Sequence, residues 1–586
     1  MNKTPGSENR LQDSSTETED HSQASPVSEK KEWSHVSGPK TPPLQFVTIS
    51  QMVNDTVARF GEREAVISVH QNIRRTYNEL NADINALAAG LLALGLERGD
   101  RLGIWAPNCY EWVLTQLATA RIGVILVNIN PAYRLAEVEY ALNKVGCKAI
   151  VVAEQFKTSR YLDMIRELAP ELDRCNPAEL KSENLPQLQI VIAISADPGP
   201  GVLSFDAVKS SGSTSEREQL AAIETTLDPD DAINVQFTSG TTGMPKGATL
   251  THYNIVNNAR FVTDRIAMRE EDRLCIPVPL YHCFGMVMGV LGVISKGATM
   301  VFPADGFDAQ TTMQALSDER CTAVYGVPTM FVAMLDVLDE GNYDLGALRT
   351  GIMAGAPCPV EIMERVIAEM NMKQVTICYG MTETSPVSFQ SFLDDPVQMR
   401  CETVGRVHPH LEVKIVDDAG ATVRRGEQGE LCTRGYSVMK EYWDDEENTA
   451  NSVRDGWMHT GDLATIDEDG FCRITGRVKD MIIRGGENIY PREIEEYLFR
   501  HPEISQAQVF GIPDQKFGEV VCAWVMIQPG ADLQESDVVE FCKGQIAHYK
   551  VPEHVRLVSE IPMTITGKPQ KFVMRDRMLE MLEDEA

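Results

Sequence analysis

The chain has 586 residues, which is too long for one ordinary hydrophobic core, so we expect two or more structural units. Hydrophobic residues make up 43% and charged residues 24% of the chain, as is typical of a globular protein, and the formal net charge is −31. Because phosphate backbones and anionic lipids are bound by clustered Lys and Arg, this acidic balance excludes nucleic acid and anionic lipid surfaces as default partners.

The first 45 residues differ from the rest, because they are rich in Ser, Thr, Glu and Pro and poor in large apolar residues. Such a segment buries too little surface to offset its ordering entropy, so we predict a disordered acidic tail over residues 1–45. It has no apolar stretch typical of a secretory signal, and its acids and few arginines are unlike a mitochondrial transit peptide.

Regular patterns begin at about residue 46. The short apolar runs "RLGIWAP", "VILVNI", "AIVVAE" and "LQIVIAI" indicate buried strands, and they alternate with helical stretches such as 77–96 and 111–123. This alternation predicts a large layered α/β domain over residues 46–479. The apolar segment 283–295 is too short to span a bilayer and predicts a buried helix, so we expect no transmembrane segment.

The pattern changes again toward the C-terminus. Between about residues 401 and 475, short strands with turn residues every 8 to 12 positions indicate a small, barrel-like sheet within the large domain. After Asp480 the sequence predicts a separate α+β unit, residues 480–586, which is long enough for a small domain. The thirteen cysteines are scattered without a C-x-x-C pair, which favours a reducing compartment, and we expect the cytoplasm.

The segment "TSGTTGMPKG", residues 238–247, stands between the strand-like "AINVQF" and a helical pattern that begins after Thr251. Its glycines permit close approach of the backbone to a ligand, and its N–H groups and hydroxyls can donate to phosphate oxygens. The string is not a Walker A loop, because Pro245 stands where that motif needs the Gly of Gly-Lys-Ser/Thr, and it does not fit G-x-G-x-x-G. We therefore predict an anion-binding loop of another type between a strand and a helix.

This string resembles the phosphate loop of the adenylate-forming superfamily, which includes acyl-CoA synthetases, luciferases and peptide-synthetase adenylation domains. Other strings resemble the family in the same order: "YHCFG" (281–285), "AGAP" (354–357), "YGMTE" (379–383), "HTGD" (459–462), "GRVKD" (476–480), "RGGENIYPREIE" (484–495) and "TITGKPQK" (564–571). The likeness covers roughly residues 46–575 and is nearest to the medium-chain fatty acyl-CoA ligases. One departure is Pro569, where the family usually has a branched aliphatic residue.

The resemblance implies a two-step ligase. ATP would activate a fatty acid to acyl-AMP and pyrophosphate, and coenzyme A would then take the acyl group and release AMP, with Mg²⁺ as cofactor and the C-terminal domain as a mobile lid. Two alternatives stay open: an adenylating enzyme that delivers its acyl group to a carrier protein or another acceptor, and a non-catalytic nucleotide-binding regulator. The joint presence of Lys568, Glu383 and Asp462 argues against the regulator. The expected partners are small molecules, and homo-oligomerisation is left open.

The resemblance also implies roles for individual residues. Lys568 would screen the two anionic reactants, Thr382 would donate to the α-phosphate, Glu383 would bind Mg²⁺, and His282 would line the acyl site. The β- and γ-phosphates would be held by Thr238, Ser239, Gly240, Thr241, Thr242, Gly243 and Lys246. Adenine and ribose would be bound by Gly355, Ala356, Pro357, Tyr379, Asp462 and Arg477. Asp480 would be the hinge, and Arg484, Gly485 and Gly486 would lie near coenzyme A.

The kind of acid that the protein would activate is inferred from three apolar runs of the sequence. The runs "CFGMVMGV", "VYGVPTMF" and "MAGAP" would give an apolar wall of Met, Val and Phe, and no charged residue stands ready for a polar tail. We therefore expect an aliphatic acid of middling length, while short, long-chain and aromatic acids stay open.

Overall fold

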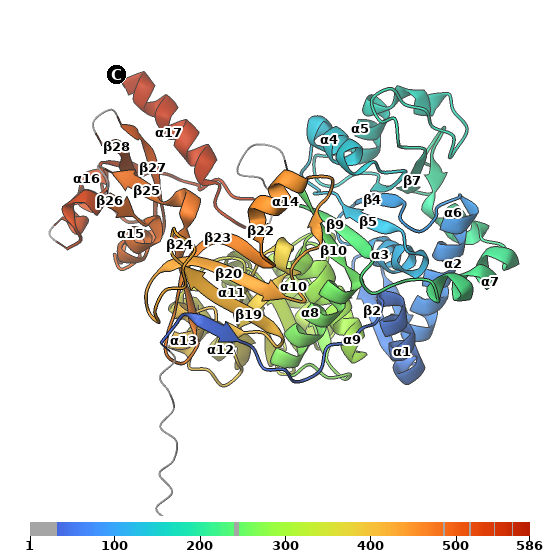
Figure 1. The fold of residues 1–586 in the computed structure, drawn as a ribbon, viewed down its shortest axis with the longest axis horizontal. Coiled ribbons are helices and arrows are strands. Elements are labelled where there is room, and N and C mark those ends of the chain that lie inside the picture. Colours follow the sequence, from blue (N-terminus) through green and yellow to red (C-terminus); the bar gives the residue numbers. More distant parts are fainter. Residues whose placement is uncertain are drawn as a thin grey trace, which may run out of the picture.

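The computed structural model describes residues 32–238, 245–484, 487–514, 517–543, 545–564 and 567–585 (Figure 1). Within these ranges the strands form five sheets, of which four belong to a large body and one to a smaller C-terminal body. The large layered α/β part and the small α+β part predicted from the sequence are both present.

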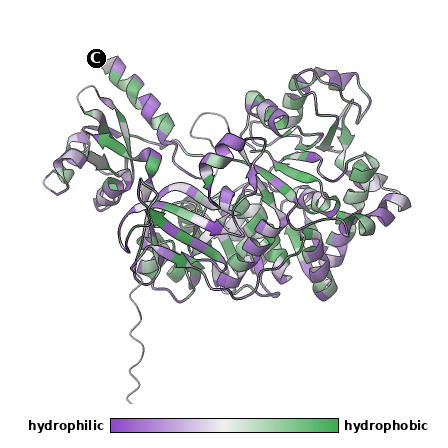
Figure 2. Cartoon of the chain, in the orientation of Figure 1, coloured by the Kyte–Doolittle hydropathy of each residue, from purple (hydrophilic) through white to green (hydrophobic). Residues whose placement is uncertain are grey.

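The first large sheet has eight strands in the described part of the chain, in the order β21-β10-β9-β5-β4-β6-β7-β8. The strands from β9 to β8 are parallel, whereas β10 and β21 are added antiparallel at one edge. Their bounds are β4 (Arg101–Trp105), β5 (Ile125–Asn128), β6 (Ala149–Ala153), β7 (Ile190–Ile194), β8 (Leu203–Ser204), β9 (Ala232–Thr238), β10 (Lys246–Thr251) and β21 (Glu441–Tyr442). The central strands are buried and hydrophobic along most of their length, as expected of parallel strands covered on both faces (Figure 2).

The second large sheet has seven strands among the described residues, in the order β15-β14-β13-β11-β12-β2-β3, all parallel except the edge strand β3. Its strands are β2 (Glu64–Ser68), β3 (Ile73–Thr76), β11 (Arg273–Cys275), β12 (Thr299–Phe302), β13 (Ala323–Gly326), β14 (Thr350–Met353) and β15 (Gln374–Thr376).

Helices separate and cover these two sheets. Helix α3 contacts β4 and β5 of the first sheet, while its neighbour α2 contacts β2 and β3 of the second, so this helical layer lies between them. The helices of the large body are α1 (Ile49–Phe60), α2 (Tyr77–Ala93), α3 (Tyr110–Ile122), α4 (Leu135–Val145), α5 (Tyr161–Leu168), α6 (Phe205–Ser211), α7 (Thr214–Glu224), α8 (His252–Arg265), α9 (Gly292–Lys296), α10 (Ala309–Asp318), α11 (Pro328–Glu340), α12 (Val360–Glu369), α13 (Val397–Glu402) and α14 (Glu446–Ser452).

The predicted buried helix at 283–295 is present, but its first two turns are wider than an α-helix. Residues Phe284–Leu291 form the π-helix η2, which continues directly into α9, and every residue of η2 is buried. Long π-helical runs are rare and are frequently found at functional sites.

The barrel-like part is an antiparallel sheet, β1-β19-β20-β23-β22, with β24 paired to β23, and a separate three-stranded sheet, β16-β17-β18. The strands are β1 (His35–Ser37), β16 (Cys378–Gly380), β17 (Val387–Gln390), β18 (Arg406–Val407), β19 (Leu411–Val416), β20 (Gly429–Gly435), β22 (Val453–Arg454), β23 (Trp457–Ile466) and β24 (Cys472–Arg477). The short strands predicted over 401–475 are therefore confirmed.

The C-terminal body contains the sheet β26-β25-β28-β27, with β29 paired to β28, and two hydrophobic cores of its own. Its elements are β25 (Ile482–Arg484), β26 (Glu487–Ile489), α15 (Pro491–Leu498), β27 (Ile504–Asp514), β28 (Gly518–Ile527), α16 (Glu535–Cys542), β29 (His554–Leu557) and α17 (Lys571–Glu585). In Figure 1 this body lies at the left of the large one, and α17 slants along its upper side, from the C mark down toward the large body.

Two sequence expectations need correction. The prediction of disorder up to residue 45 is wrong for residues 32–45, because β1 pairs with β19 along His35–Ser37 and adds a strand to the barrel-like sheet. The predicted loop between a strand and a helix is instead a connection between two antiparallel strands, since Lys246–Thr251 forms β10 before α8 begins. Residues 1–31 lie outside the described residues.

The contacts of β1 generate a stability prediction. Ser34 N donates to Val423 O at 2.8 Å, Ile415 N donates to Ser34 O at 2.9 Å, and Gly38 N donates to Leu411 O at 2.8 Å. At about 1 kcal/mol net for each hydrogen bond, removal of residues 1–38 should cost roughly 3 kcal/mol. Thermal unfolding should show a midpoint several degrees lower than that of a control truncation of residues 1–31. Equal midpoints for the two truncations would contradict the structural role of β1.

Candidate functional site

The predicted ribose ligand Asp462 lies at a bend of β23 and is almost completely buried, with 8% of its surface exposed. Its Oδ2 accepts a hydrogen bond from Tyr379 Oη at 2.5 Å, and its Oδ1 accepts one from Arg477 Nε at 3.0 Å. The structure thus brings together three side chains that the sequence placed in one site. Burial, and next the charge of Asp462, raises the pKa of Tyr379 well above its usual value, so the phenol remains a donor.

Glu383 occupies a second buried position, on the short 3₁₀ turn η3 (Thr382–Thr384) that follows β16. Its Oε1 accepts hydrogen bonds from Tyr442 Oη at 2.8 Å and from Thr238 Oγ1 at 3.3 Å. Thr238 is the last residue of β9, so the carboxylate lies beside the start of the predicted phosphate loop. Tyr442 has no counterpart in the sequence prediction, because its contact depends on the edge pairing of β21 with β10.

The predicted phosphate loop is only partly visible. Ser239, Gly240, Thr241, Thr242 and Gly243 lie outside the described residues. Lys246, on β10, donates to Asn448 Oδ1 at 2.5 Å, and its Nζ lies 5.0 Å from the ring centre of Tyr442. The structure therefore anchors both flanks of the loop, Thr238 against Glu383 and Lys246 against α14.

Lys568 lies on a turn of the C-terminal body that reaches the large body. Thr564 N donates to Lys568 O at 2.7 Å, Lys568 N donates to Thr564 Oγ1 at 3.0 Å, and Gly567 adopts a positive φ of 75°. A Cβ on Gly567 would lie 3.3 Å from Val327 Cγ2 in the large body, so the two bodies touch here. The predicted turn is confirmed, and it places Lys568 near residues of the other body.

The electrostatic surroundings of Lys568 come from the site just described. Burial, and next the charge of Arg477, lowers the pKa of the Lys568 ammonium, while Asp462 and Glu383 oppose this effect. Within the described ranges, the ammonium forms no hydrogen bond or ion pair. A partly buried cation without a partner, close to two carboxylates and a guanidinium, is arranged to meet an anion that enters from solvent.

His282 lies just before η2 and is neutral. Its Nδ1 accepts the N–H of Phe284 at 3.1 Å, and burial, followed by the charge of Lys568, lowers its pKa to about 3. His282 and the two carboxylates are thus all within electrostatic range of Lys568 on the C-terminal turn. The apolar wall beyond includes Phe284 stacked on Tyr325, with ring centres 5.5 Å apart.

The remaining predicted residues lie around this region. Gly355, with φ of 91°, follows the carboxyl end of β14, and a Cβ there would lie 3.2 Å from Val327 Cγ1; Ala356 and Pro357 come next and are at least partly exposed. Thr382 is partly exposed on η3 and interacts with the thiol of Cys283.

Asp480 ends a single 3₁₀ turn, Val478–Asp480, between β24 of the large body and β25 of the small one. Arg484 Nη2 donates to Glu553 Oε2 at 3.2 Å, and its guanidinium lies 4.2 Å from the ring centre of Phe517, so it is packed inside the small body. Gly485 and Gly486 lie outside the described residues.

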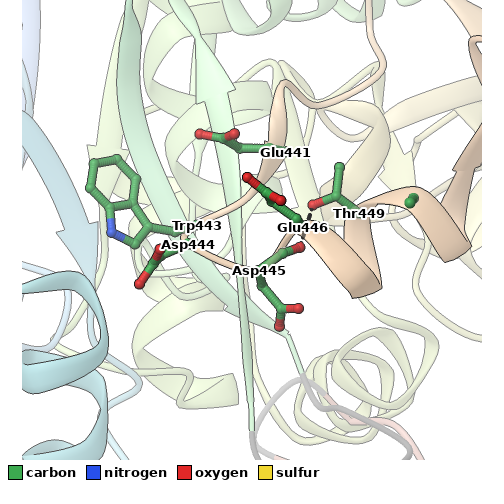
Figure 3. Close-up of a pocket in the computed structure, with 7 residues that line it drawn as sticks. Glu441, Trp443, Asp444, Asp445, Glu446 and Thr449 are labelled. Atoms are coloured by element: carbon green, nitrogen blue, oxygen red, sulfur yellow. Dashed lines mark hydrogen bonds between the residues drawn. The ribbon is translucent and has the colours of Figure 1, made fainter.

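A surface cavity of about 620 Å³ lies beside α14 and is lined by carboxylates (Figure 3). Glu441, Asp444, Asp445 and Glu446 surround it together with Trp443, and Thr449 Oγ1 donates to Asp445 O at 2.7 Å. Four carboxylates would repel a nucleotide, so this cavity is not the place for the phosphates.

Comparisons with known proteins agree with this geometry. Residues 53–443 match the family model described as AMP-binding enzyme, and residues 493–568 match the AMP-binding enzyme C-terminal domain. The chain is 48% identical to "Medium-chain acyl-CoA ligase ACSF2, mitochondrial" from Danio rerio (93% of this chain, 90% of that one) and 46% identical to "Putative acyl-CoA synthetase YngI" from Bacillus subtilis (91% and 97%). It superimposes on ATP-bound MatB from Rhodopseudomonas palustris with a TM-score of 0.78 at 28% identity (91% and 99%).

The bond between Tyr379 and Asp462 can be measured through a double-mutant cycle. A hydrogen bond to a charged group contributes about 1.5 to 3 kcal/mol, so Tyr379→Phe and Asp462→Ala should be non-additive by that amount in the unfolding transition of the large body. In the control cycle, Tyr140→Phe, which removes a bond to Pro245 O, should add to Asp462→Ala. Additivity in both cycles would contradict the observed bond.

Proposed function

The chain belongs to the AMP-binding enzyme family and, by its 48% identity to an acyl-CoA ligase over 93% of its length, is an AMP-forming acyl-CoA synthetase, and we propose that it activates medium-chain fatty acids in a single cleft closed by its C-terminal domain. The observation that carries this proposal is the Lys568 ammonium, which has no hydrogen-bond or ion-pair partner among the described residues and lies close enough to Asp462 and Glu383 to interact with their charges.

The first step joins two anions, so it needs a cation between them. A carboxylate oxygen of the acid attacks the α-phosphorus of ATP, the bond from that phosphorus to the bridging oxygen breaks, and pyrophosphate leaves with the electron pair. Like charges ~4 Å apart repel by roughly 4 kcal/mol at an effective dielectric near 20, which is about a thousandfold in rate. Lys568 would screen this repulsion and the charge that develops in the transition state.

The nucleotide would be held by the groups around Asp462 and Glu383. Asp462 accepts hydrogen bonds only, which suits the two ribose hydroxyls, and Arg477 can donate to the same sugar. Tyr379 would offer its ring to adenine near Gly355, Ala356 and Pro357. Thr238, Lys246 and the loop residues between them would bind the β- and γ-phosphates, and Thr382 the α-phosphate.

The residues present fit a magnesium ion. Glu383 offers a buried carboxylate beside Thr238, and Mg²⁺ in nucleotide sites is commonly held by one or two carboxylates plus phosphate oxygens. When bound, the ion would neutralise charge on the phosphates. Tyr442, which donates to Glu383 Oε1, would keep that carboxylate oriented.

The attacking group needs no general base, because a carboxylic acid is already ionised at neutral pH. His282 would therefore serve as a wall of the acyl site, in keeping with its pKa of about 3. The buried Phe284, Met286 and Tyr325 would continue that wall, and an apolar lining suits an alkyl chain. The medium chain length in the name of the Danio rerio relative supports the same choice.

The second step would bring the thiol of coenzyme A to the acyl carbon, where the new C–S bond forms, the C–O bond to the phosphate breaks with its electron pair going to AMP, and the thiol proton passes to solvent. We infer a rotation of the small body about Asp480, since a single turn separates two bodies that have separate cores. The segment with Arg484, Gly485 and Gly486 would then come near coenzyme A, and Arg484 would have to leave Glu553 to meet a phosphate.

The cellular location is proposed from the thiols. All thirteen cysteines are free of disulfides, which favours a reducing compartment such as the cytoplasm, whereas the name of the Danio rerio relative places that protein in mitochondria. None of the helices in the described ranges is long and apolar enough to cross a membrane. Small molecules are the proposed partners.

The proposed reaction is tested with purified protein, ATP, Mg²⁺ and saturated acids from two to eighteen carbons, with and without coenzyme A. We expect AMP release that depends on coenzyme A, a thioester product, and the highest kcat/KM for acids of about six to twelve carbons. An optimum outside that range would refute the chain length. Acyl-AMP that persists with coenzyme A present would favour delivery to a carrier protein, and no turnover with any acid would favour a regulator.

The role of Lys568 is tested by separating the half-reactions. Lys568→Ala should slow acyl-AMP formation at least a hundredfold, about 3 kcal/mol of transition-state stabilisation, and leave thioester formation from supplied acyl-AMP nearly unchanged. The control, Lys543→Ala, removes an exposed lysine paired with Glu540 and should change neither step. Equal loss in both half-reactions would contradict the assigned role.

A further inference from the structure

Asp462 lies in a bulge, where the pairing of β20 with β23 becomes irregular. Glu430 pairs with Leu463 and Cys432 pairs with His459, so the three residues 460–462 stand opposite Leu431 alone. Such bulges bend a strand and redirect its side chains, and they are over-represented next to active sites. The direction of the Asp462 carboxylate therefore depends on what holds this bulge.

Glu430 holds the bulge at two points. Its Oε1 accepts the backbone N–H of Gly461 at 3.1 Å, and its Oε2 lies 2.7 Å from Nδ1 of His459. Gly461 has a φ of 71°, a left-handed conformation that a side chain would strain, so its N–H is directed by the bulge and not by the sheet ladder. Charged acceptors make the stronger hydrogen bonds, which suits a carboxylate to this task.

A second contact carries the restraint to Asp462 itself. Thr460 Oγ1 donates to Leu431 O at 2.8 Å and accepts the backbone N–H of Asp462 at 3.1 Å. Thr460 is thus tied to β20, and Asp462 is tied to Thr460, while Glu430 fixes the residues on either side of Thr460. The side chain of Asp462 then meets Tyr379 and Arg477 in the site.

Glu430, Cys432 and His459 also have their potential metal-ligating atoms within 4.8 Å of one another. Both oxygens of Glu430 are engaged by Gly461 and His459, so a metal ion would have to replace those bonds. Burial, and next the charge of Glu430, raises the pKa of Cys432 to about 12, which keeps its thiol protonated at neutral pH. The observed contacts favour a hydrogen-bonding role over a metal site.

We propose that Glu430 is a positioning residue for the nucleotide, which holds the 460–462 bulge so that Asp462 faces the ribose hydroxyls. The inference rests on the proposed function, because it takes Asp462 as the ribose ligand. Glu430 does not touch the substrate. Its effect is confined to the fit of the sugar, so it concerns recognition of ATP and not of the acid.

The test combines changes in the protein with changes in the sugar, as in a double-mutant cycle. For each protein variant, kcat/KM for acyl-AMP formation is measured with ATP, 2′-deoxy-ATP and 3′-deoxy-ATP. In the wild type, kcat/KM should be roughly tenfold or more lower with the deoxy analogue that lacks the hydroxyl bonded to Asp462 than with ATP. Glu430→Ala should show a similar loss with ATP, no further loss with that analogue, and an unchanged KM for the acid. Glu430→Gln should keep most activity, because its amide oxygen can still accept from Gly461.

Matched controls make the outcome specific. Glu412→Ala removes a carboxylate from the neighbouring strand β19, where it pairs with Arg434, and should leave the ribose discrimination intact. If Glu430→Ala does not fold, Glu430→Met keeps the side-chain length without a comparable acceptor and takes its place.

Three results would overturn the inference: full ribose discrimination in Glu430→Ala, equal loss in Glu430→Gln and Glu430→Ala, or a stoichiometric metal ion in purified wild type that is lost in Cys432→Ala. Failure of the proposed function looks different. In that case the wild type would use both deoxy analogues with the same kcat/KM as ATP, or Asp462→Asn would still discriminate between ATP and the deoxy analogues.

Discussion

The arrangement of this protein depends on a lysine of the small body that lies near two carboxylates of the large body and, among the described residues, has no hydrogen-bond or ion-pair partner. The Lys568 ammonium is partly buried near Asp462 and Glu383, yet it pairs with neither, and Arg477 adds a like charge nearby. Taking a cation out of water is costly unless an opposite charge compensates for it. The two carboxylates supply part of that compensation, and an entering polyphosphate would supply the rest. This arrangement therefore favours the binding of an anionic ligand.

The body that carries this lysine is joined to the large one by a short connection. The small body has separate hydrophobic cores and is connected through the turn Val478–Asp480. At the Lys568 turn, a Cβ added to Gly567 would lie 3.3 Å from Val327 Cγ2 of the large body, so the two bodies are close together there. Two bodies with separate cores and a short connection can change their relative position, so the approach of the lysine can depend on the ligand. The fixed parts of the site, Asp462 and Glu383, belong to the large body, where strand pairing holds them.

Much of this could be predicted from the sequence, for identifiable reasons. The parallel strands are continuous apolar runs, and Lys568 follows Thr-Gly, which indicates a turn. Local patterns could not reveal Tyr442 or Glu430, because their bonds to Glu383 and Gly461 join residues 59 and 31 positions apart through strand register. The sequence favours a loop over Lys246–Thr251, because its glycine and lysine hide a short strand whose pairing with β9 is not visible in the local pattern. Residues 32–45 have few apolar side chains, and β1 is ordered by backbone pairing to β19, which composition does not report. The roles of the loop residues 239–243 stay predictions.

The most direct measurement of the central claim is the pKa of Lys568 with and without nucleotide, from competitive labelling of lysine amines over a pH series followed by mass spectrometry. The account predicts a pKa below the ordinary 10.5 in the free protein, because burial and Arg477 disfavour the charge. With ATP and Mg²⁺ bound, the pKa should rise by one unit or more, since each unit corresponds to about 1.4 kcal/mol of interaction with the new anion. An ordinary pKa in the free protein that ATP leaves unchanged would contradict the account.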